Sequence, residues 1–328
     1  MNKQGDFKIP SVTVKGDGTE RLVGFELEFS GLSLAQTVEI VQSSLDGNLG
    51  NKTAAEQIIH VKSLGDFNIE IDWDFLKRTA EENENHGEDS QWLEQLSKAA
   101  SMLVPVEVVS PPISITHLDA LDQMVSALRE AGAMGTEESL IAAYGVHINA
   151  DIPKLDAETL FAYLRSFALL QWWLVEAHQV NTARKISPYI DLYPENYVKL
   201  LLSQSPPDMD NIFSDYLKFN ASRNRALDLL PLLAEIDENR VFDKVDDPKI
   251  KARPAFHYRL PNCSIEHKNW SLAHSWNTWW IIDELASRPD YLKELSAAFL
   301  DTEQPIIGVI RKTWVNYLDQ WLKDHKLV

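Results

Sequence analysis

The chain has 328 residues and a formal net charge of −18, from 31 Lys and Arg against 49 Asp and Glu. This excess of carboxylates disfavours a protein that coats DNA or RNA, because such binding requires many cations against the phosphates. Hydrophobic residues make up 45% of the chain, with only 13 Gly and 15 Pro, a composition that indicates a globular protein and excludes a disordered one. The length suits one large or two ordinary domains.

The sequence predicts neither a disulfide nor a membrane anchor. Cys263 is the single cysteine, which excludes an intrachain disulfide and fits a reducing compartment. Residues 1–20 contain no apolar signal core, and the most apolar stretch, 161–175, is broken by Arg165 and Gln171 and is too short to span a bilayer. We therefore expect a cytoplasmic protein that binds neither nucleic acid nor membrane. The oligomeric state stays open, and an oligomer is compatible with the sequence.

The first half of the chain favours strands. After a flexible N-terminal arm over residues 1–20, short apolar runs that carry alternating or isolated polar residues predict strands at 21–30, 57–63, 66–74, 102–110 and 140–150. Helical spacing of apolar residues predicts helices over 34–45 and 116–131. Thr116 and Asp119 suit a capping box at the start of the second helix.

The second half favours helices. The segments with helical spacing are 156–180, 208–219, 224–236, 271–287, 290–300 and 306–326. A strand at 253–260 interrupts them, and the acidic tract 81–90 is expected to be a solvated loop. Early strands and late helices predict an α+β fold. Because strands are expected on both sides of the helical block at about 154–250, we interpret that block as an elaboration within one catalytic domain over 21–328.

Two carboxylates on one strand are the strongest candidates for chemistry. In Gly24-Phe25-Glu26-Leu27-Glu28-Phe29, alternation places Glu26 and Glu28 on one face, roughly 6.6 Å apart along the strand. Two carboxylates so placed repel each other unless they are solvated or share cations, and hard divalent ions prefer oxygen ligands. The alternative is an exposed sheet face that merely carries two acids.

Three further strands repeat this construction, with polar side chains on one face of an apolar run. Glu107 lies in an apolar run and needs a partner or a metal if the strand is buried. His147 and Asn149 share a face of the strand at 140–150, and His257 and Arg259 share a face of the strand at 253–260. A histidine on a strand is either a hydrogen-bonded core residue or a metal ligand.

These segments, in this order, resemble the amidoligase family, a branch of the carboxylate–amine ligases related to glutamate–cysteine ligase and glutamine synthetase. The resemblance covers about residues 21–285. It rests on the Gly-x-Glu-x-Glu strand, the acid before a Ser-Pro turn, the Gly-x-His-x-Asn strand, the strand that carries Asp72, and the late strand that carries Arg259. It implies a glutamine-synthetase-like antiparallel sheet, with helices on one face and with ATP and divalent metals held on its concave face.

The resemblance also implies roles for single residues. Glu26, Glu28 and Glu107 match carboxylate ligands of Mg²⁺ or Mn²⁺, and His147 matches an imidazole ligand on the ATP side, next to Asn149. Asp72 matches an acid near the substrate end of the site and is a candidate catalytic residue.

The late strand departs from the family pattern. Relatives commonly carry Glu-Phe-Arg where this chain has His257-Tyr258-Arg259. Arg259 matches the arginine that faces phosphate, so it is both a catalytic and an ATP-binding candidate. His257 replaces a carboxylate ligand, and Glu266 is an alternative for that metal position.

Arg223 and Arg225 are ambiguous. Relatives carry arginine before a comparable helix, which assigns this pair to phosphate or to a substrate carboxylate. The alternative is that both arginines form salt bridges on a very acidic protein. Cys263 lies close to Arg259 in the sequence, but no base for a nucleophile is evident near it.

The expected function is therefore an ATP- and Mg²⁺-dependent ligase that joins a carboxylate to an amine through an acyl phosphate. The expected partners are a small-molecule acid and amine, of amino-acid or peptide type from the family context. Three alternatives stay open: a phosphotransferase on the same scaffold, as in guanidino kinases, a two-metal hydrolase, and a non-catalytic relative that binds nucleotide.

Overall fold

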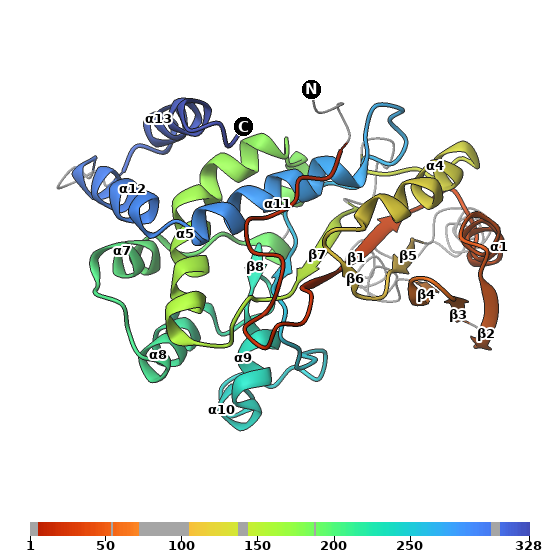
Figure 1. Cartoon of the computed structure of the whole chain (residues 1–328), viewed down its shortest axis with the longest axis horizontal. Helices are drawn as coiled ribbons and strands as arrows, with labels where there is room; N and C mark the ends of the chain where they lie inside the picture. Colours follow the sequence, from red (N-terminus) through yellow and green to blue (C-terminus); the bar gives the residue numbers. More distant parts are fainter. Residues whose placement is uncertain (1–5, 54, 72–104, 137–143, 187, 303–308) are drawn as a thin grey trace, which may run out of the picture.

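One antiparallel sheet organises the molecule, with helices packed on it and beside it (Figure 1). The computed structural model describes residues 6–53, 55–71, 105–136, 144–186, 188–302 and 309–328. The sheet has nine strands in the order β2-β3-β4-β5-β1-β7-β9-β8, with β6 paired to β1. The predicted α+β class and the antiparallel sheet are both confirmed.

The strands are short, and β1 lies at the centre of the sheet. Their bounds are β1 Leu22–Phe29, β2 Asn48–Lys52, β3 Glu56–Val61, β4 Gly65–Ile71, β5 Val106–Val109, β6 Ile113–Ser114, β7 Val146–Ala150, β8 Leu227–Asp228 and β9 His257–Tyr258. Of the strand expected at 253–260, only the two residues of β9 have strand conformation. Residues 72–104 and 137–143 fall outside the described part, which includes Asp72 and the expected loop at 81–90.

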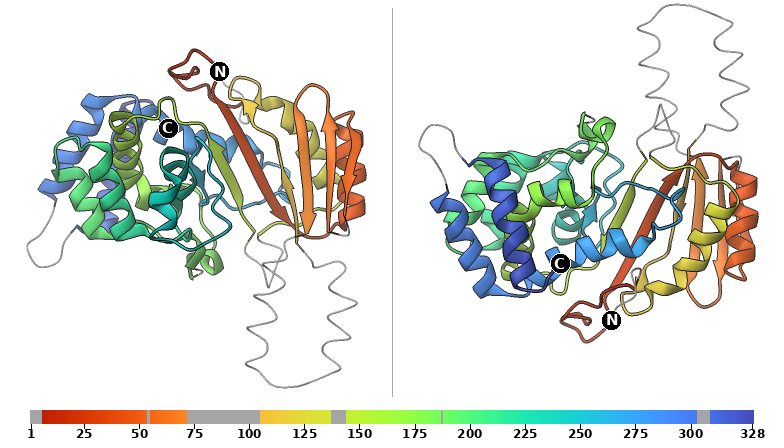
Figure 2. Two further views of the ribbon diagram at one scale, coloured as in Figure 1. Left: turned by 90° about the horizontal axis from the view of Figure 1, so that it is seen from below. Right: turned by 90° about the horizontal axis from the view of Figure 1, so that it is seen from above.

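The two faces of the sheet differ in polarity because polar and apolar residues alternate along each strand. On β1, the side chains of Val23, Phe25, Leu27 and Phe29 are fully buried on one face. Helices α1 (Leu34–Ser44), α4 (Asp122–Glu130) and α11 (Leu272–Ala286) lie on this apolar face (Figure 2). The other face carries Glu26 and Glu28.

The predicted capping box at Thr116 and Asp119 is wrong. The segment begins with a 3₁₀ turn, η1 (Leu118–Leu121), whose N-terminal cap residue His117 makes no side-chain capping bond. The Thr116 hydroxyl instead lies 2.9 Å from Ser114 Oγ and 3.0 Å from His117 Nδ1. Local hydrogen bonds between neighbouring polar side chains therefore replace the cap.

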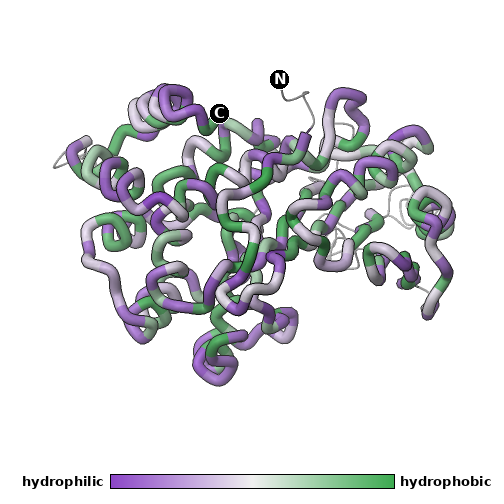
Figure 3. The backbone as a smooth tube through the Cα atoms, viewed as in Figure 1, coloured by the Kyte–Doolittle hydropathy of each residue, from purple (hydrophilic) through white to green (hydrophobic). Residues whose placement is uncertain are grey.

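A helical region is inserted between strands of the sheet. Its elements are α5 (Ala157–Ala177), α6 (Thr182–Ile186), η2 (Pro188–Ile190), α7 (Glu195–Ser203), α8 (Met209–Asn220), α9 (Leu230–Ile236) and α10 (Glu238–Phe242). The long helix α5 begins where predicted, because the Asp156 carboxylate caps it by accepting from the Thr159 amide. Since α5 is hydrophobic on most of its surface (Figure 3), it is covered by α7, α11, α12 (Pro289–Asp301) and α13 (Arg311–Asp324).

The structure divides one predicted helix. Residues 224–236 form strand β8 followed by the short helix α9, because Leu227 and Asp228 pair with β9 before the helix begins. Pro231 lies in the first turn of α9, where a missing amide proton costs no hydrogen bond. Strands β7, β9 and β8 are neighbours in the sheet although α5 to α8 separate β7 from the other two in sequence.

Residues 6–11 run along α11, and the red segment in Figure 1 then turns away from the helix into a loop closed by the bridge between Val14 and Glu20. The Trp276 indole donates to the Lys8 carbonyl, and the Ser11 hydroxyl donates to the Glu284 carboxylate. At the end of this segment, the buried Arg21 guanidinium forms an ion pair with Asp283 of α11. Among the described residues, no helix combines the length and the hydrophobicity that a membrane crossing requires.

Candidate active site on the polar face of the sheet

Antiparallel pairing brings the predicted residues of three strands together on the polar face. Glu26 of β1 lies opposite His147 of β7, and Glu28 of β1 lies opposite Glu107 of β5. Residues opposite each other in a sheet have neighbouring side chains on the same face. The pairing therefore turns three separate sequence motifs into one site.

The first set of side chains, which we call the imidazole group, consists of Glu26, His147 and His257. His147 Nδ1 lies 2.7 Å from Glu26 Oε2, and His257 Nε2 lies 3.7 Å from the same oxygen. One potential ligand atom from each residue lies within 4.8 Å of the others. His257 Nε2 is buried and makes no hydrogen bond to any residue that the structure describes. A buried imidazole nitrogen that lacks a partner fits a metal ligand, because leaving it unpaired costs desolvation energy.

The second set, which we call the carboxylate group, consists of Glu28, Glu107 and His147. Its potential ligand atoms again lie within 4.8 Å of one another. The Gly145 amide donates to Glu28 Oε2 at 2.8 Å, while Glu28 Oε1 lies 3.6 Å from His147 Nε2. His147 thus belongs to both groups, with Nδ1 turned to Glu26 and Nε2 turned to Glu28. Carboxylate oxygens suit hard divalent cations such as Mg²⁺.

A row of carboxylates extends the second group across the sheet. Glu107 lies opposite Glu28 on one side and Glu70 of β4 on the other, and Glu70 lies opposite Glu56 of β3. Burial raises the pKa of Glu70, and the charges of Glu56 and Glu26 raise it further. Adjacent negative charges of this kind are stabilised by cations.

The protonation states in the imidazole group favour metal ligation. Burial lowers the pKa of His257 well below its usual value, and the nearby Arg259 charge lowers it further. His257 is therefore neutral and retains a lone pair. Burial alone would raise the pKa of Glu26, but its contacts with His257 and His147 hold that pKa well below the usual value. Glu26 is therefore a carboxylate, which also accepts a 2.8 Å bond from the Asn149 amide.

Arginines border the imidazole group. Arg259 Nη2 lies 3.3 Å from His257 Nδ1 and 3.6 Å from Oδ2 of the fully buried Asp228. Arg253 donates to Asn149 Oδ1 at 2.8 Å. Arg223, Arg253 and Arg259 all lower the pKa of Asp228, which burial nevertheless raises to about 6. Because three guanidinium groups act on the single Asp228 carboxylate, their positive charges outnumber its negative charge, and the excess can attract an anion such as phosphate.

Gly145 has a steric role at the junction of β7 and β9. A Cβ atom there would lie 2.7 Å from Arg184 Nη2 and 3.4 Å from His147 Nε2. Arg184 is buried and donates to the carbonyls of Arg259, Leu260 and Pro261. The glycine of the Gly-x-His-x-Asn motif therefore gives Arg184 the space to hold the end of β9 beside β7.

Three further candidates lie apart from these groups. Arg225 donates to the carbonyls of Leu192 and Phe219, and its Nη1 lies 3.7 Å from Asp191, so its guanidinium is engaged by the protein. Glu266, the alternative to His257, lies beside Gly135 and belongs to neither group. Cys263 is buried, and burial raises its pKa, which does not favour a nucleophilic thiolate.

Sequence reasoning did not assign Arg253, Asp228 or Glu70 to the site. Arg253 was detectable, because it lies four positions before His257, and an extended segment places residues four positions apart on the same face. Glu70 alternates with apolar residues in β4, just as Glu26 does in β1. Asp228 was hidden, because the helical spacing of 224–236 gave no sign of a strand pairing with β9.

The fold and the site together define the class of protein: an α+β protein with two potential metal-ligand groups and an arginine cluster on one sheet face. The sequence matches the family described as "Putative amidoligase enzyme" over residues 19–281. This match covers most of the chain, including both ligand groups and the arginines, and the chain belongs to this amidoligase family of enzymes. A comparison with curated proteins gives no match.

Proposed function

We propose that this amidoligase is an ATP- and divalent-metal-dependent carboxylate–amine ligase with a glutamine-synthetase-like active site. The observation that carries the proposal is the side-by-side placement of the imidazole and carboxylate groups, which share His147, next to Arg259. Phosphoryl transfer requires divalent cations and guanidinium groups around the phosphates, and this face supplies the residues for both.

The proposed reaction has two steps. A carboxylate oxygen of the acid attacks the γ-phosphorus of ATP, the bond to the bridging β,γ-oxygen breaks, and ADP and an acyl phosphate result. The nitrogen of the amine then attacks the acyl carbon, an amide bond forms, inorganic phosphate leaves, and the nitrogen loses a proton. The first step activates a carboxylate that would not condense with an amine in water.

The side chains have distinct tasks in this scheme. Glu26 and His257 would hold one cation and Glu28 and Glu107 another, and His147 would complete one of the two sites, because a neutral imidazole has a single free lone pair. Bound Mg²⁺ or Mn²⁺ would supply the positive charge that neutralises the phosphate oxygens. Arg259, positioned by Asp228, would add a planar guanidinium to the γ-phosphoryl group. This division explains how a protein of net charge −18 can bind a polyanion.

Charge varies along the polar face, and this supports an orientation for the substrates. Arg253 and Arg259 lie at the β9 end, while Glu70 and Glu56 lie at the β4 and β3 end. We therefore assign the nucleotide phosphates to the β9 end, with Arg223 and Asn149 as further contacts. The amine approaches from the carboxylate end, and Asp72, which follows β4 in the sequence and lies outside the described residues, is our candidate to accept its proton. The acid is assigned to an amino-acid or peptide-like molecule.

Product formation in the presence of pooled acids and amines tests the proposal. The wild-type enzyme, with Mg²⁺ and ATP, should release ADP and phosphate in equal amounts only when both pools are present, and mass spectrometry should detect an amide. Glu107→Gln should retain the fold by circular dichroism and lose both products. ADP release without free phosphate would identify a phosphotransferase instead, and amide hydrolysis without ATP would identify a hydrolase.

A further inference from the structure

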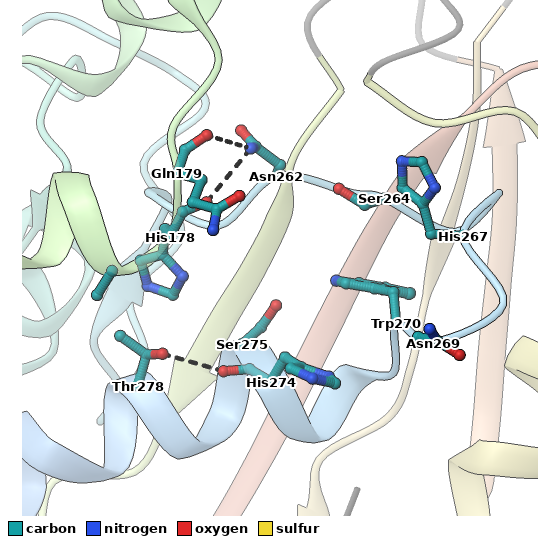
Figure 4. Close-up of a pocket in the computed structure, with 11 residues that line it drawn as sticks. His178, Gln179, Asn262, Ser264, His267, Asn269, Trp270, His274, Ser275 and Thr278 are labelled. Carbon is teal, nitrogen blue, oxygen red and sulfur yellow. Dashed lines mark hydrogen bonds between the residues drawn. The ribbon is translucent and has the colours of Figure 1, made fainter. Parts of the chain in front are cut away.

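A polar pocket lies on the opposite side of β9 from the candidate active site. It has a volume of about 290 Å³ and is formed by the end of α5, the segment after β9 and the first turns of α11 (Figure 4). Its wall includes His178, whose Nε2 lies 2.8 Å from the Tyr258 hydroxyl. Tyr258 is the last residue of β9, between His257 and Arg259 in the sequence, and alternation turns its side chain away from theirs. The pocket is therefore separate from both metal-ligand groups.

Hydrogen-bonding groups without partners point into this pocket. Ser275 of α11 is 2% exposed, and its hydroxyl makes no hydrogen bond with any described residue. Figure 4 shows this hydroxyl directed into the space between His178, Asn262 and Trp270. The nitrogen-bearing edge of the Trp270 indole points toward the same space. The Ser275 oxygen is not among the buried side-chain atoms that lack a partner, so it is reached from the pocket and can bond to water or to a ligand there.

The pocket wall lacks the side chains that are always charged at neutral pH. None of its eleven residues is an aspartate, glutamate, lysine or arginine. Burial, together with the Arg184 charge, lowers the pKa of His178 to about 3, so this ring is neutral. His274 Nδ1 accepts from the Ser271 amide, which leaves that nitrogen without a proton. An anionic or cationic ligand would thus lose hydration without finding an aspartate, glutamate, lysine or arginine in this wall to offset the loss.

We propose that this pocket binds an uncharged, polyhydroxylated molecule of monosaccharide size. The Ser275 and Ser264 hydroxyls provide hydrogen bonds around it, and the Thr278 hydroxyl, which donates to the His274 carbonyl, can still accept one. The Trp270 indole provides an N–H donor beside an apolar surface. The volume lies below the range of pockets for drug-sized ligands, which fits a molecule of about one sugar ring. This proposal is independent of the ligase chemistry.

Ligand-observed NMR with three related sugars tests the proposal. Glucose, glucosamine and glucuronate have the same ring but are neutral, cationic and anionic. Glucose should bind at millimolar concentration and more tightly than the two charged sugars, both with and without Mg-ATP. Glu28→Gln should bind glucose as the wild type does, so a failed ligase assay leaves this test intact.

Two substitutions locate the binding. Ser275→Ala should weaken glucose binding about fivefold, because one hydrogen bond is lost, and Ser275→Val should abolish binding by also filling space. Ser166→Ala is the matched control: it removes another buried helical hydroxyl, which donates to the Ile282 carbonyl outside the pocket. No glucose binding, unchanged binding in both Ser275 variants, or tighter binding of either charged sugar would overturn the proposal.

Discussion

The imidazole group and the carboxylate group share one histidine but have opposite surroundings. Glu26, His147 and His257 are bordered by Arg253 and Arg259. The carboxylate group continues instead into Glu70 and Glu56. One end of the sheet face therefore offers positive charge and the other negative charge. In the proposed reaction, the positive end would take the phosphates of ATP, the negative end would take the amine, and the cations would lie between them.

The largest expected effect comes from the carboxylate group. Glu28→Gln keeps an oxygen that can accept from the Gly145 amide, but it replaces a carboxylate with a poor metal ligand. We expect amide formation to fall on the order of a thousandfold, since metal ions supply several kcal/mol of charge stabilisation. Titration with Mn²⁺ should show weakened binding. Glu39→Gln, on the exposed side of α1, is the control, and near-wild-type activity of Glu28→Gln would contradict the metal assignment.

The two motif glycines should differ in their effect on stability. Gly145→Ala should lower the free energy of unfolding by about 1–3 kcal/mol, because the new Cβ would lie 2.7 Å from the buried Arg184 guanidinium. At Gly24 the nearest atoms are 3.6 and 3.9 Å away, which is ordinary contact, so Gly24→Ala should cost less. Urea denaturation of both variants measures this. Equal destabilisation would show that Arg184 has room to move.

The arginines should separate into nucleotide contacts and structural contacts. Arg253→Ala should raise the KM for ATP about tenfold, the loss expected for one charge-assisted contact, with little change in the unfolding midpoint. Arg225→Ala should lower the unfolding midpoint and leave the KM for ATP nearly unchanged, because Arg225 donates to the Leu192 and Phe219 carbonyls. If Arg225→Ala raised the KM for ATP as much as Arg253→Ala did, the assignment of Arg225 to a structural role would be wrong.

The smallest effect concerns the pH dependence of stability. His178 has a pKa of about 3 in the folded protein, against about 6.5 when unfolded. The unfolded state therefore binds the proton more tightly, and stability falls as pH drops below 6.5. The wild type should lose roughly 1 kcal/mol from this group between pH 6.5 and 5.5. His178→Gln should lose less over that interval, and urea denaturation of both proteins at the two pH values measures the difference.

The sequence predicted the parts of the site that alternation reveals. Glu26, Glu28, Glu107, His147 and His257 all lie on one face, because each strand alternates polar with apolar residues. The order of the strands in the sheet was not accessible from one sequence, so the contact between Glu26 and His257 was not predicted.

Local patterns also failed where tertiary contacts override them. The apolar spacing at 224–236 predicts a helix, yet pairing with β9 makes Leu227 and Asp228 a strand and brings Asp228 to Arg259. Arg225 has the same residue type and neighbourhood as Arg223, yet backbone carbonyls engage its guanidinium. Such assignments depend on which partner lies nearby in space, which a linear pattern does not contain.

Oxygen transfer from substrate to phosphate tests the central claim most directly. The enzyme would be incubated with Mg-ATP, a pool of amines and a pool of amino acids and peptides whose carboxyl oxygens are ¹⁸O. If an acyl phosphate forms on the polar face, each phosphate released with the amide carries one ¹⁸O atom, and Glu28→Gln releases none. Amide formation with unlabelled phosphate, or the same label transfer by Glu28→Gln, would contradict the account.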